Sequence, residues 1–196
     1  MLFILRHGAT CALEGPKRYI GRTDFSLNEL GAAQAEAWAE CFSDIPLDVI
    51  LCSNLKRSAE TAAIIGRHCK LNPIVETSLR EIDLGEWEGL SFEALKLCHP
   101  RAFAARGADL ANFRPPGGES FGDLQQRVVG ALEGILTHGP SPVLLVGHAG
   151  VNRVLLCHLL GLPLANLFRL AQDPAGLSLV VGRRSHYRLT LLNLLL

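Results

Sequence analysis

Basic and imidazole side chains follow three short apolar runs of this 196-residue sequence. Arg6 and His7 come directly after the first run. Arg57 follows the second run, and His148 follows the third. If the three runs are parallel strands of one sheet, their carboxyl ends meet at one edge and bring these side chains together. Such a cluster predicts a binding site for an anion, and phosphate is the anion that it suits best.

His7 is the residue that distinguishes a catalytic site from a simple phosphate site. A neutral imidazole can attack phosphorus and form a phosphohistidine. The cations beside His7 disfavour protonation of its ring, which keeps the ring nucleophilic near neutral pH. Arg6 and Arg57 can each hold phosphoryl oxygens through two hydrogen bonds and stabilise the charge that develops on them.

The leaving alkoxide of such a reaction needs a proton, and the attacking water then needs a base. Glu81 follows an apolar pair at 74–75 and is predicted to serve as this acid and base. Glu86 and Glu88 are alternative carboxylates in the same stretch. The residues together predict hydrolysis of a phosphomonoester.

The elements that must position these residues are visible in the apolar pattern. Short runs rich in β-branched residues are typical of strands buried on both faces, and the longer segments between them have helical spacing. The predicted strands are 2–5, 48–52, 142–146, 177–181 and 187–192, and the predicted helices are 28–42, 55–69, 91–98, 120–137 and one that follows Gly150. This order predicts an α/β fold, a three-layer α/β/α sandwich with a mostly parallel central sheet and an antiparallel edge.

The length favours one domain, residues 1–196, since domains commonly hold about 100–200 residues. The segment 79–118 is the least regular part of the chain. It is long for a connection between a strand and a helix, and long connections are often lids or substrate loops. We therefore expect this segment to be a lid or specificity insertion.

The composition excludes several functions. The 19 basic and 19 acidic residues cancel, which argues against a nucleic-acid partner. No apolar run approaches the length of about 18 residues that a membrane span needs, and the first residues are too short for the core of a signal peptide. The six cysteines form no Cys-x-x-Cys pair, which favours reduced thiols over a zinc site or a disulfide framework. We expect a cytoplasmic protein, a monomer or homodimer, whose partner is a small-molecule phosphomonoester.

Several blocks of the sequence, in order over residues 2–195, resemble the histidine phosphatase superfamily, the phosphoglycerate-mutase-like group. A match to a single tripeptide would be weak evidence for the family, but here several blocks match in register. They are Leu5–Thr10, Gly21 with Asp24, Ser53–Ala62, Glu81 with Gly85–Gly89, Pro116–Ser120 and Gly147–Gly150.

The resemblance implies a role for each candidate residue. It places His7 at the phosphorylated position and Glu81 at the position of the proton donor. The implied phosphate-binding residues are Arg6, Arg57, His148 and Thr10, although Thr10 has the alternative role of capping a turn. The substrate pocket is expected to include Gly21, Glu119 and Ser120. No metal and no cofactor are expected, because the cationic side chains supply the charge that a metal would bring.

Three departures bear on the reaction. Ala9 stands where the family commonly has Glu, and Leu13 and Ile20 stand where mutases have a polar pair that helps to bind phosphate. These departures weaken the alternative of a phosphoglycerate mutase more than they weaken a phosphatase. A pseudoenzyme that binds a phosphorylated ligand without turnover is the alternative from another class.

Within the family, the segments 48–62 and 170–178 resemble α-ribazole phosphatases of cobalamin biosynthesis. That substrate, α-ribazole 5′-phosphate, would require the segment 101–114 to form a pocket for a benzimidazole riboside. The block 116–120 is shared with broad-specificity phosphatases, which are the alternative. The sequence from Lys17 to Arg22 carries cations that either lie at the pocket mouth or belong to an exposed loop.

Overall fold

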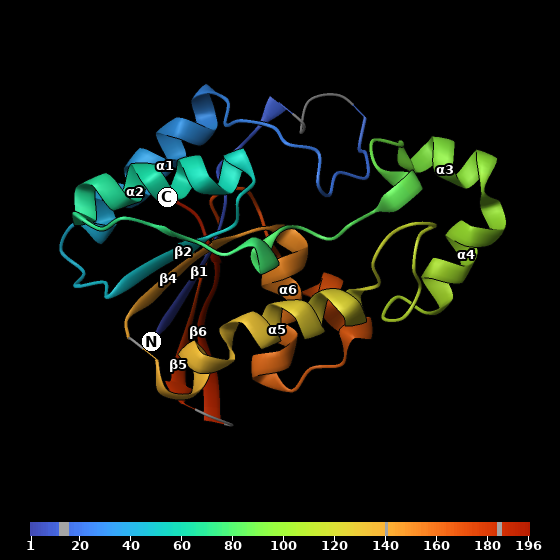
Figure 1. Ribbon diagram of the computed structural model, residues 1–196. Helices are drawn as coiled ribbons and strands as arrows, with labels where there is room; N and C mark the ends of the chain where they lie inside the picture. Colours follow the sequence, from blue (N-terminus) through green and yellow to red (C-terminus); the bar gives the residue numbers. More distant parts are fainter. Residues whose placement is uncertain (12–15, 140, 184–185) are drawn as a thin grey trace.

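The computed structural model describes residues 1–11, 16–139, 141–183 and 186–196. Its centre is a six-stranded sheet with the strand order β3-β2-β4-β1-β5-β6 (Figure 1). The strands are β1 (Leu2–Arg6), β2 (Val49–Cys52), β3 (Ile74–Val75), β4 (Val143–Gly147), β5 (Leu177–Arg183) and β6 (His186–Leu194). The first four strands run parallel, whereas β5 and β6 are antiparallel to their neighbours. The predicted, mostly parallel sheet with an antiparallel edge is confirmed.

Helices cover both faces of the sheet. In Figure 1, α1 and α2 lie above it, α5 and α6 lie below it, and α3 and α4 lie at one end of the sandwich. The helices are α1 (Glu29–Phe42), α2 (Lys56–Cys69), α3 (Phe92–Cys98), α4 (Pro100–Ala108), α5 (Phe121–His138) and α6 (Ala149–Leu160), with 3₁₀ turns η2 (Thr77–Leu79), η3 (Gly85–Trp87) and η4 (Leu164–Arg169). No helix in the described part of the chain is long and apolar enough to span a bilayer.

Two apolar clusters hold the layers together. Because side chains alternate along a strand, Phe3 and Leu5 of β1 pack in the cluster that contains Trp38 of α1. Ile4, between them, packs in the other cluster, with Leu155 of α6. The strands are therefore buried on both faces, as their continuous apolar runs predict.

Local signals account for most of the helix ends. The Ser120 side chain accepts a hydrogen bond from the Asp123 main chain, and the Asp123 side chain accepts one from the Ser120 main chain, which forms a capping box at the start of α5. The sequence pattern missed α4, because its nine residues bury no side chain and carry no apolar stripe. It also missed the two-residue strand β3, whose side chains are exposed.

The register of the parallel strands aligns the ends of β1, β2 and β4, and the site is built on the segments that follow them. Arg6 at the end of β1 pairs with Gly147 at the end of β4, and Cys52 at the end of β2 pairs with Val146. The main-chain N–H of His7 donates to the Gly147 carbonyl at 3.1 Å. The three segments that leave these strands therefore start side by side.

Candidate active site

A cavity of about 460 Å³ lies where β1, β2 and β4 end. The described residues that line it are Arg6, His7, Thr10, Pro16, Lys17, Arg18, Ile20, Phe25, Arg57, Glu81, Phe92, Ala149, Arg153 and Gln172. His148 does not line the cavity but lies beside His7, with the two ring centroids 5.2 Å apart. The structure thus brings together all six residues predicted to bind phosphate or to catalyse its transfer.

His7 is a buried imidazole whose two ring nitrogens have different partners. Its Nδ1 lies 2.8 Å from the carbonyl oxygen of Gly8, which can only accept a hydrogen bond, so Nδ1 carries the proton. Its Nε2 accepts a hydrogen bond from Nε of Arg57 at 3.2 Å. Burial and the charges of Arg6 and Arg57 hold the pKa of His7 well below its usual 6.5. His7 therefore has an unprotonated Nε2 at neutral pH.

His148 is a second buried imidazole, bonded through its Nε2. Its Nε2 lies 2.7 Å from Oγ of Ser53, and that oxygen also accepts a hydrogen bond from the main-chain N–H of Leu55. The Ser53 hydroxyl can donate its proton to Nε2 while it accepts from Leu55, and in that arrangement the ring proton of neutral His148 is on Nδ1. Nδ1 is buried and has no hydrogen-bond partner among the described residues. Burial, reinforced by His7 and Arg57, also holds the pKa of His148 well below 6.5.

Arg57, in the first turn of α2, is held on three sides. Its Nη1 donates to the Thr23 carbonyl and its Nη2 to the Gly21 carbonyl, both at 2.7 Å, while its Nε donates to His7. Burial lowers the pKa of Arg57, and the nearby Glu81 carboxylate opposes this shift. The guanidinium is consequently charged and fixed beside the nucleophilic nitrogen.

Arg6 is held by the segment between η4 and β5. Its Nη1 donates to the Gln172 carbonyl at 2.7 Å, and the Gln172 side chain accepts a hydrogen bond from Asn152. Burial lowers the pKa of Arg6 to about 10, with Glu81 opposing the shift and Arg153 adding to it. Its Nε is buried without a partner in the described ranges. Arg6 is therefore charged at neutral pH and has a free donor.

Glu81 is buried at the amino end of α6. Its Oε2 accepts a hydrogen bond from the Gly150 main chain at 2.9 Å, and its Oε1 accepts one from the main chain of Ile82 at 3.0 Å. A Cβ at position 150 would lie 2.4 Å from Oε1, so glycine is needed there for the carboxylate to approach the helix. These bonds aim one carboxylate into the same cavity as His7.

The two alternative carboxylates lie elsewhere. Glu86 is exposed, and neither it nor Glu88 lines the cavity. The Glu88 carboxylate accepts hydrogen bonds from the main chain of Gly21 and from the main chain and hydroxyl of Thr23. Glu88 thereby orders the loop whose carbonyls hold Arg57.

The three residues expected in the substrate pocket lie outside the cavity lining. Gly21 instead supports Arg57 from behind through its carbonyl. Glu119 forms two hydrogen bonds with Arg127, and these consume its carboxylate. Ser120 is buried as the cap of α5. These three residues therefore help to hold the surrounding structure together and do not line the cavity.

The outer part of the cavity is formed by exposed or half-buried side chains. We call this set the rim: Lys17, Arg18, Ile20, Phe25 and Phe92. We call the inner set the floor: Arg6, His7, Arg57, Glu81 and His148. The expected cations Lys17 and Arg18 lie on the rim. Arg22 does not, because it forms an ion pair with Asp83 at 2.6 Å.

Other expectations about the pocket have different outcomes. No residue of the segment 101–114 lines the cavity, because α4 is separated from it by packed aromatic rings that include Tyr19 and Phe92. From the expected insertion 79–118, only Glu81 and Phe92 reach the cavity. Leu13 lies outside the described residues.

Sequence reasoning missed two polar residues of the cavity wall, Arg153 and Gln172. Arg153 lies one turn beyond Ala149 on α6, so both face the cavity. The available signal was a lone arginine that interrupts an apolar helix. Gln172 had no such signal, since it lies in an irregular segment between η4 and β5.

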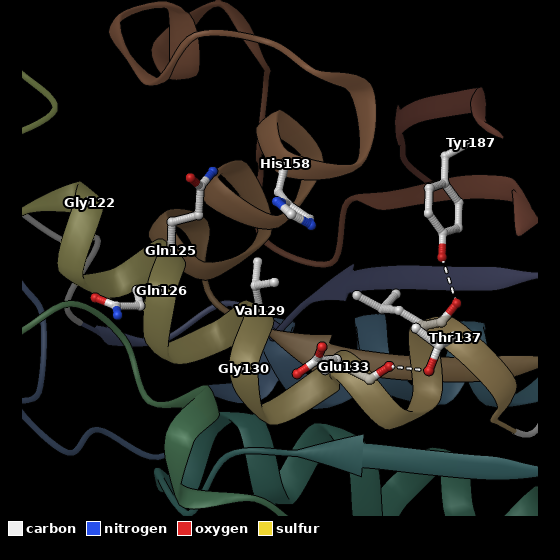
Figure 2. Close-up of a pocket in the computed structure, with 10 residues that line it drawn as sticks. Gly122, Gln125, Gln126, Val129, Gly130, Glu133, Thr137, His158 and Tyr187 are labelled. Atoms are coloured by element: carbon white, nitrogen blue, oxygen red, sulfur yellow. Dashed lines mark hydrogen bonds between the residues drawn. The ribbon is translucent and has the colours of Figure 1, made fainter. Parts of the chain in front are cut away.

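A second, larger cavity of about 530 Å³ lies between α5, α6 and β6 (Figure 2). In Figure 2, the Tyr187 hydroxyl donates to the Leu136 carbonyl and the Thr137 hydroxyl to the Glu133 carbonyl. Its described lining contains the imidazole of His158 but no arginine or lysine. Size alone therefore does not identify the site, since only the smaller cavity has the charges that suit phosphate.

No group of three or more His, Cys, Asp or Glu side chains that could hold a metal ion occurs within the described ranges. The positive charges that face the cavity come from arginine and lysine instead. The arrangement can bind a phosphoryl group, attack it from Nε2 of His7 and move a proton through Glu81.

Comparison with known proteins agrees with this chemistry. Residues 2–195 match the sequence model of the histidine phosphatase superfamily (branch 1). A glucosyl-3-phosphoglycerate phosphatase of Mycobacterium tuberculosis is 36% identical over 174 residues, which cover 84% of this chain and 77% of that protein. The structure of a mycobacterial glucosyl-3-phosphoglycerate phosphatase superposes with a TM-score of 0.87 at 33% identity, covering 98% of this chain and 97% of that chain. The α-ribazole phosphatase from Shigella flexneri superposes with a TM-score of 0.86 at 27% identity, covering 98% and 95%.

Proposed function

Because this chain belongs to the histidine phosphatase superfamily (branch 1) and is a phosphoric monoester hydrolase like its relatives, we propose that it acts through a phosphorylated His7 and without a metal. The observation that carries the proposal is the bonding of the His7 ring. Its proton is held at Nδ1 by Gly8, and its lone pair is held at Nε2 beside Arg57. The ring is thus ready to attack phosphorus without first losing a proton.

In the first step, Nε2 of His7 forms a bond to phosphorus while the bond from phosphorus to the ester oxygen breaks. The entering phosphoryl group takes over the Nε–H of Arg57, which frees the lone pair for attack. The unpartnered Nε–H of Arg6 and the Nδ1–H of His148 supply further donors to the phosphoryl oxygens. Glu81 gives its proton to the leaving alcohol oxygen.

In the second step, water attacks the phosphohistidine and Glu81 takes the proton that water loses. The bond between phosphorus and Nε2 breaks, which releases inorganic phosphate and restores neutral His7. The same donors stabilise both transfers, because the phosphoryl group stays in one place while the nucleophile and leaving group exchange roles.

The test is to trap the intermediate. The protein is mixed with a ³²P-labelled phosphomonoester in excess chelator and quenched within milliseconds. We expect an acid-labile, base-stable label on the wild type and on His68→Ala, whose imidazole is exposed on α2. His7→Ala should carry no label and should lose turnover by about 10⁴-fold or more.

The alternative functions give other results. Undiminished turnover in His7→Ala would exclude the mechanism. Calorimetric phosphate binding without turnover of any ester would indicate a pseudoenzyme. Isomerised phosphoglycerate that forms faster than free phosphate would indicate a mutase.

For the substrate, α-ribazole 5′-phosphate is one candidate. Three apolar side chains of the rim line the cavity, Ile20, Phe25 and Phe92, and a planar base can stack on the aromatic rings among them. The likeness to the Shigella enzyme supports the same substrate. A phosphoglycerate ester, as named for the mycobacterial relatives, is the other candidate. A preference of the wild type for α-ribazole 5′-phosphate over a panel of small phosphomonoesters decides between them.

A further inference from the structure

The charges that line the active-site cavity exceed what one phosphoryl group needs. Its described lining contains five cations and a single carboxylate, that of Glu81. Arg6 and Arg57 belong to the phosphate floor, and Lys17 and Arg18 are exposed on the rim. The fifth cation, Arg153, is half-buried in the wall between floor and rim and has no part in the mechanism above.

Arg153 is anchored away from the strand ends. Its Nε donates to the Leu170 carbonyl at 2.9 Å, and its guanidinium carbon lies 5.4 Å from the centre of the Phe168 ring. Both contacts are with η4 and the residue that follows it, whereas Arg6 is held by Gln172. No hydrogen bond or ion pair among the described residues uses Nη1 or Nη2 of Arg153. The guanidinium is therefore fixed along one edge and free along the other.

The surroundings do not neutralise this charge at close range. Glu81 and Asp173 raise the pKa of Arg153, but burial has the larger effect and lowers it. Neither acid forms an ion pair with Arg153 among the described residues, and each is hydrogen-bonded elsewhere, Glu81 to Gly150 and Asp173 to Asn193. A half-buried cation without a direct counterion gains free energy when an anion binds.

We infer that Arg153 binds a carboxylate on the alcohol part of the substrate, a specificity that rests on the function proposed above. The free Nη1 and Nη2 edge presents two parallel N–H donors, which match the two oxygens of one carboxylate. Arg153 brings one positive charge to this wall, which balances a carboxylate but not a second phosphate dianion, and the nearby Glu81 carboxylate disfavours further negative charge. The substrate class is thus a small phosphomonoester that also carries a carboxylic acid.

The experiment compares two esters that differ at one group. 3-Phosphoglycerate carries a carboxylate where glycerol 3-phosphate carries a hydroxymethyl group. In Arg153→Gln, we expect kcat/KM for 3-phosphoglycerate to fall about 10- to 100-fold, chiefly through KM, and that for glycerol 3-phosphate to change less than about threefold. Arg153→Lys keeps the charge but loses the two-pronged geometry, so its loss should be intermediate.

Arg169→Gln is the matched control, because Arg169 is a neighbouring exposed arginine that does not line the cavity. It should behave as the wild type with both esters. Equal losses with both esters in Arg153→Gln and Arg153→Lys would overturn the inference, since they would place Arg153 on the transferred phosphoryl group or in a purely structural role. No loss with either ester would also overturn it. Failure of the proposed function is distinct, because the wild type would then carry no phosphohistidine label with any phosphomonoester. A wild type that is labelled but does not prefer 3-phosphoglycerate to glycerol 3-phosphate would overturn the inference alone.

Discussion

The floor and the rim of the cavity differ in how their residues are held. Arg57, Glu81 and His148 of the floor are buried, and each has at least one hydrogen bond to another part of the chain. On the rim, Lys17 is exposed, and its side chain has no hydrogen bond or ion pair among the described residues. Residues of the floor are placed by the register of parallel strands, while those of the rim come from a loop and the start of α3. Phosphoryl transfer therefore depends on the sheet, and the approach of the substrate to the cavity mouth depends on the loops.

This difference also has an energetic side. The floor collects Arg6 and Arg57 beside two buried imidazoles. Burial lowers the pKa of all four groups, and neighbouring positive charges lower it further for Arg6, His7 and His148. The empty site is therefore less stable than a neutral one of the same shape, and a bound phosphate relieves the repulsion. The rim carries no comparable cost, because its cations are in contact with solvent.

The largest effect expected from testing this contrast is at Glu81. Glu81→Gln keeps the shape of the side chain and one of its two accepted hydrogen bonds but removes the proton donor. We expect kcat for an alkyl phosphate to fall about 10²- to 10⁴-fold. With p-nitrophenyl phosphate the loss should be smaller, because nitrophenolate leaves without protonation.

Steady-state kinetics with both esters measure this ratio, and Glu86→Gln is the control, since Glu86 is exposed and faces away from the cavity. Equal losses with the two leaving groups would show that Glu81 acts on structure and not on the leaving oxygen. A loss in Glu86→Gln instead would move the proton donor to the other carboxylate.

An effect of intermediate size is expected on the stability of the folded protein as the pH is lowered. Because the pKa values of His7 and His148 are depressed in the folded protein, the unfolded chain binds protons near pH 6.5 that the folded chain does not. Stability from this source is complete above pH 6.5 and is lost as the pH falls toward the depressed values. The slope is up to about 1.4 kcal/mol per pH unit for each histidine.

Urea unfolding between pH 7 and pH 5 measures this slope. His7→Gln should remove the contribution of one histidine and give a shallower fall. The same slope in both proteins would mean that His7 is protonated in the folded state, which would also count against its role as a nucleophile.

The smallest effect is expected on the rim. Lys17→Met should lower kcat/KM about two- to fivefold at low ionic strength and leave kcat unchanged, because an exposed charge attracts the substrate without touching the reacting atoms. The effect should vanish at high salt. Lys96→Met, an exposed substitution on α3 away from the cavity lining, is the control and should change nothing. A loss of kcat in Lys17→Met would contradict this and show that the lysine acts on the transferred phosphoryl group, as the floor residues do.

Much of the site was predictable because its residues are adjacent to strong local signals. Arg6, His7 and His148 follow continuous apolar runs, and parallel strands deliver such residues to one sheet edge. Glu119 and Ser120 had an equally clear local motif, yet their side chains stabilise the fold instead. Glu119 binds Arg127, and Ser120 caps the start of α5. A motif in the sequence does not say whether a side chain faces a ligand or supports its neighbours.

The order of the elements other than β3 and α4, the parallel sheet and the meeting of the two histidines with two arginines follow from the sequence alone, because apolar periodicity and strand direction are local properties of the chain. Only the tertiary structure decided the tautomer of His7, the choice of Glu81 over Glu88, and the place of Arg153 in the wall. Each of these depends on contacts between residues far apart in the chain, such as Glu81 with Gly150 or Arg153 with Leu170. Their geometry is set by how the layers pack, which no local pattern records.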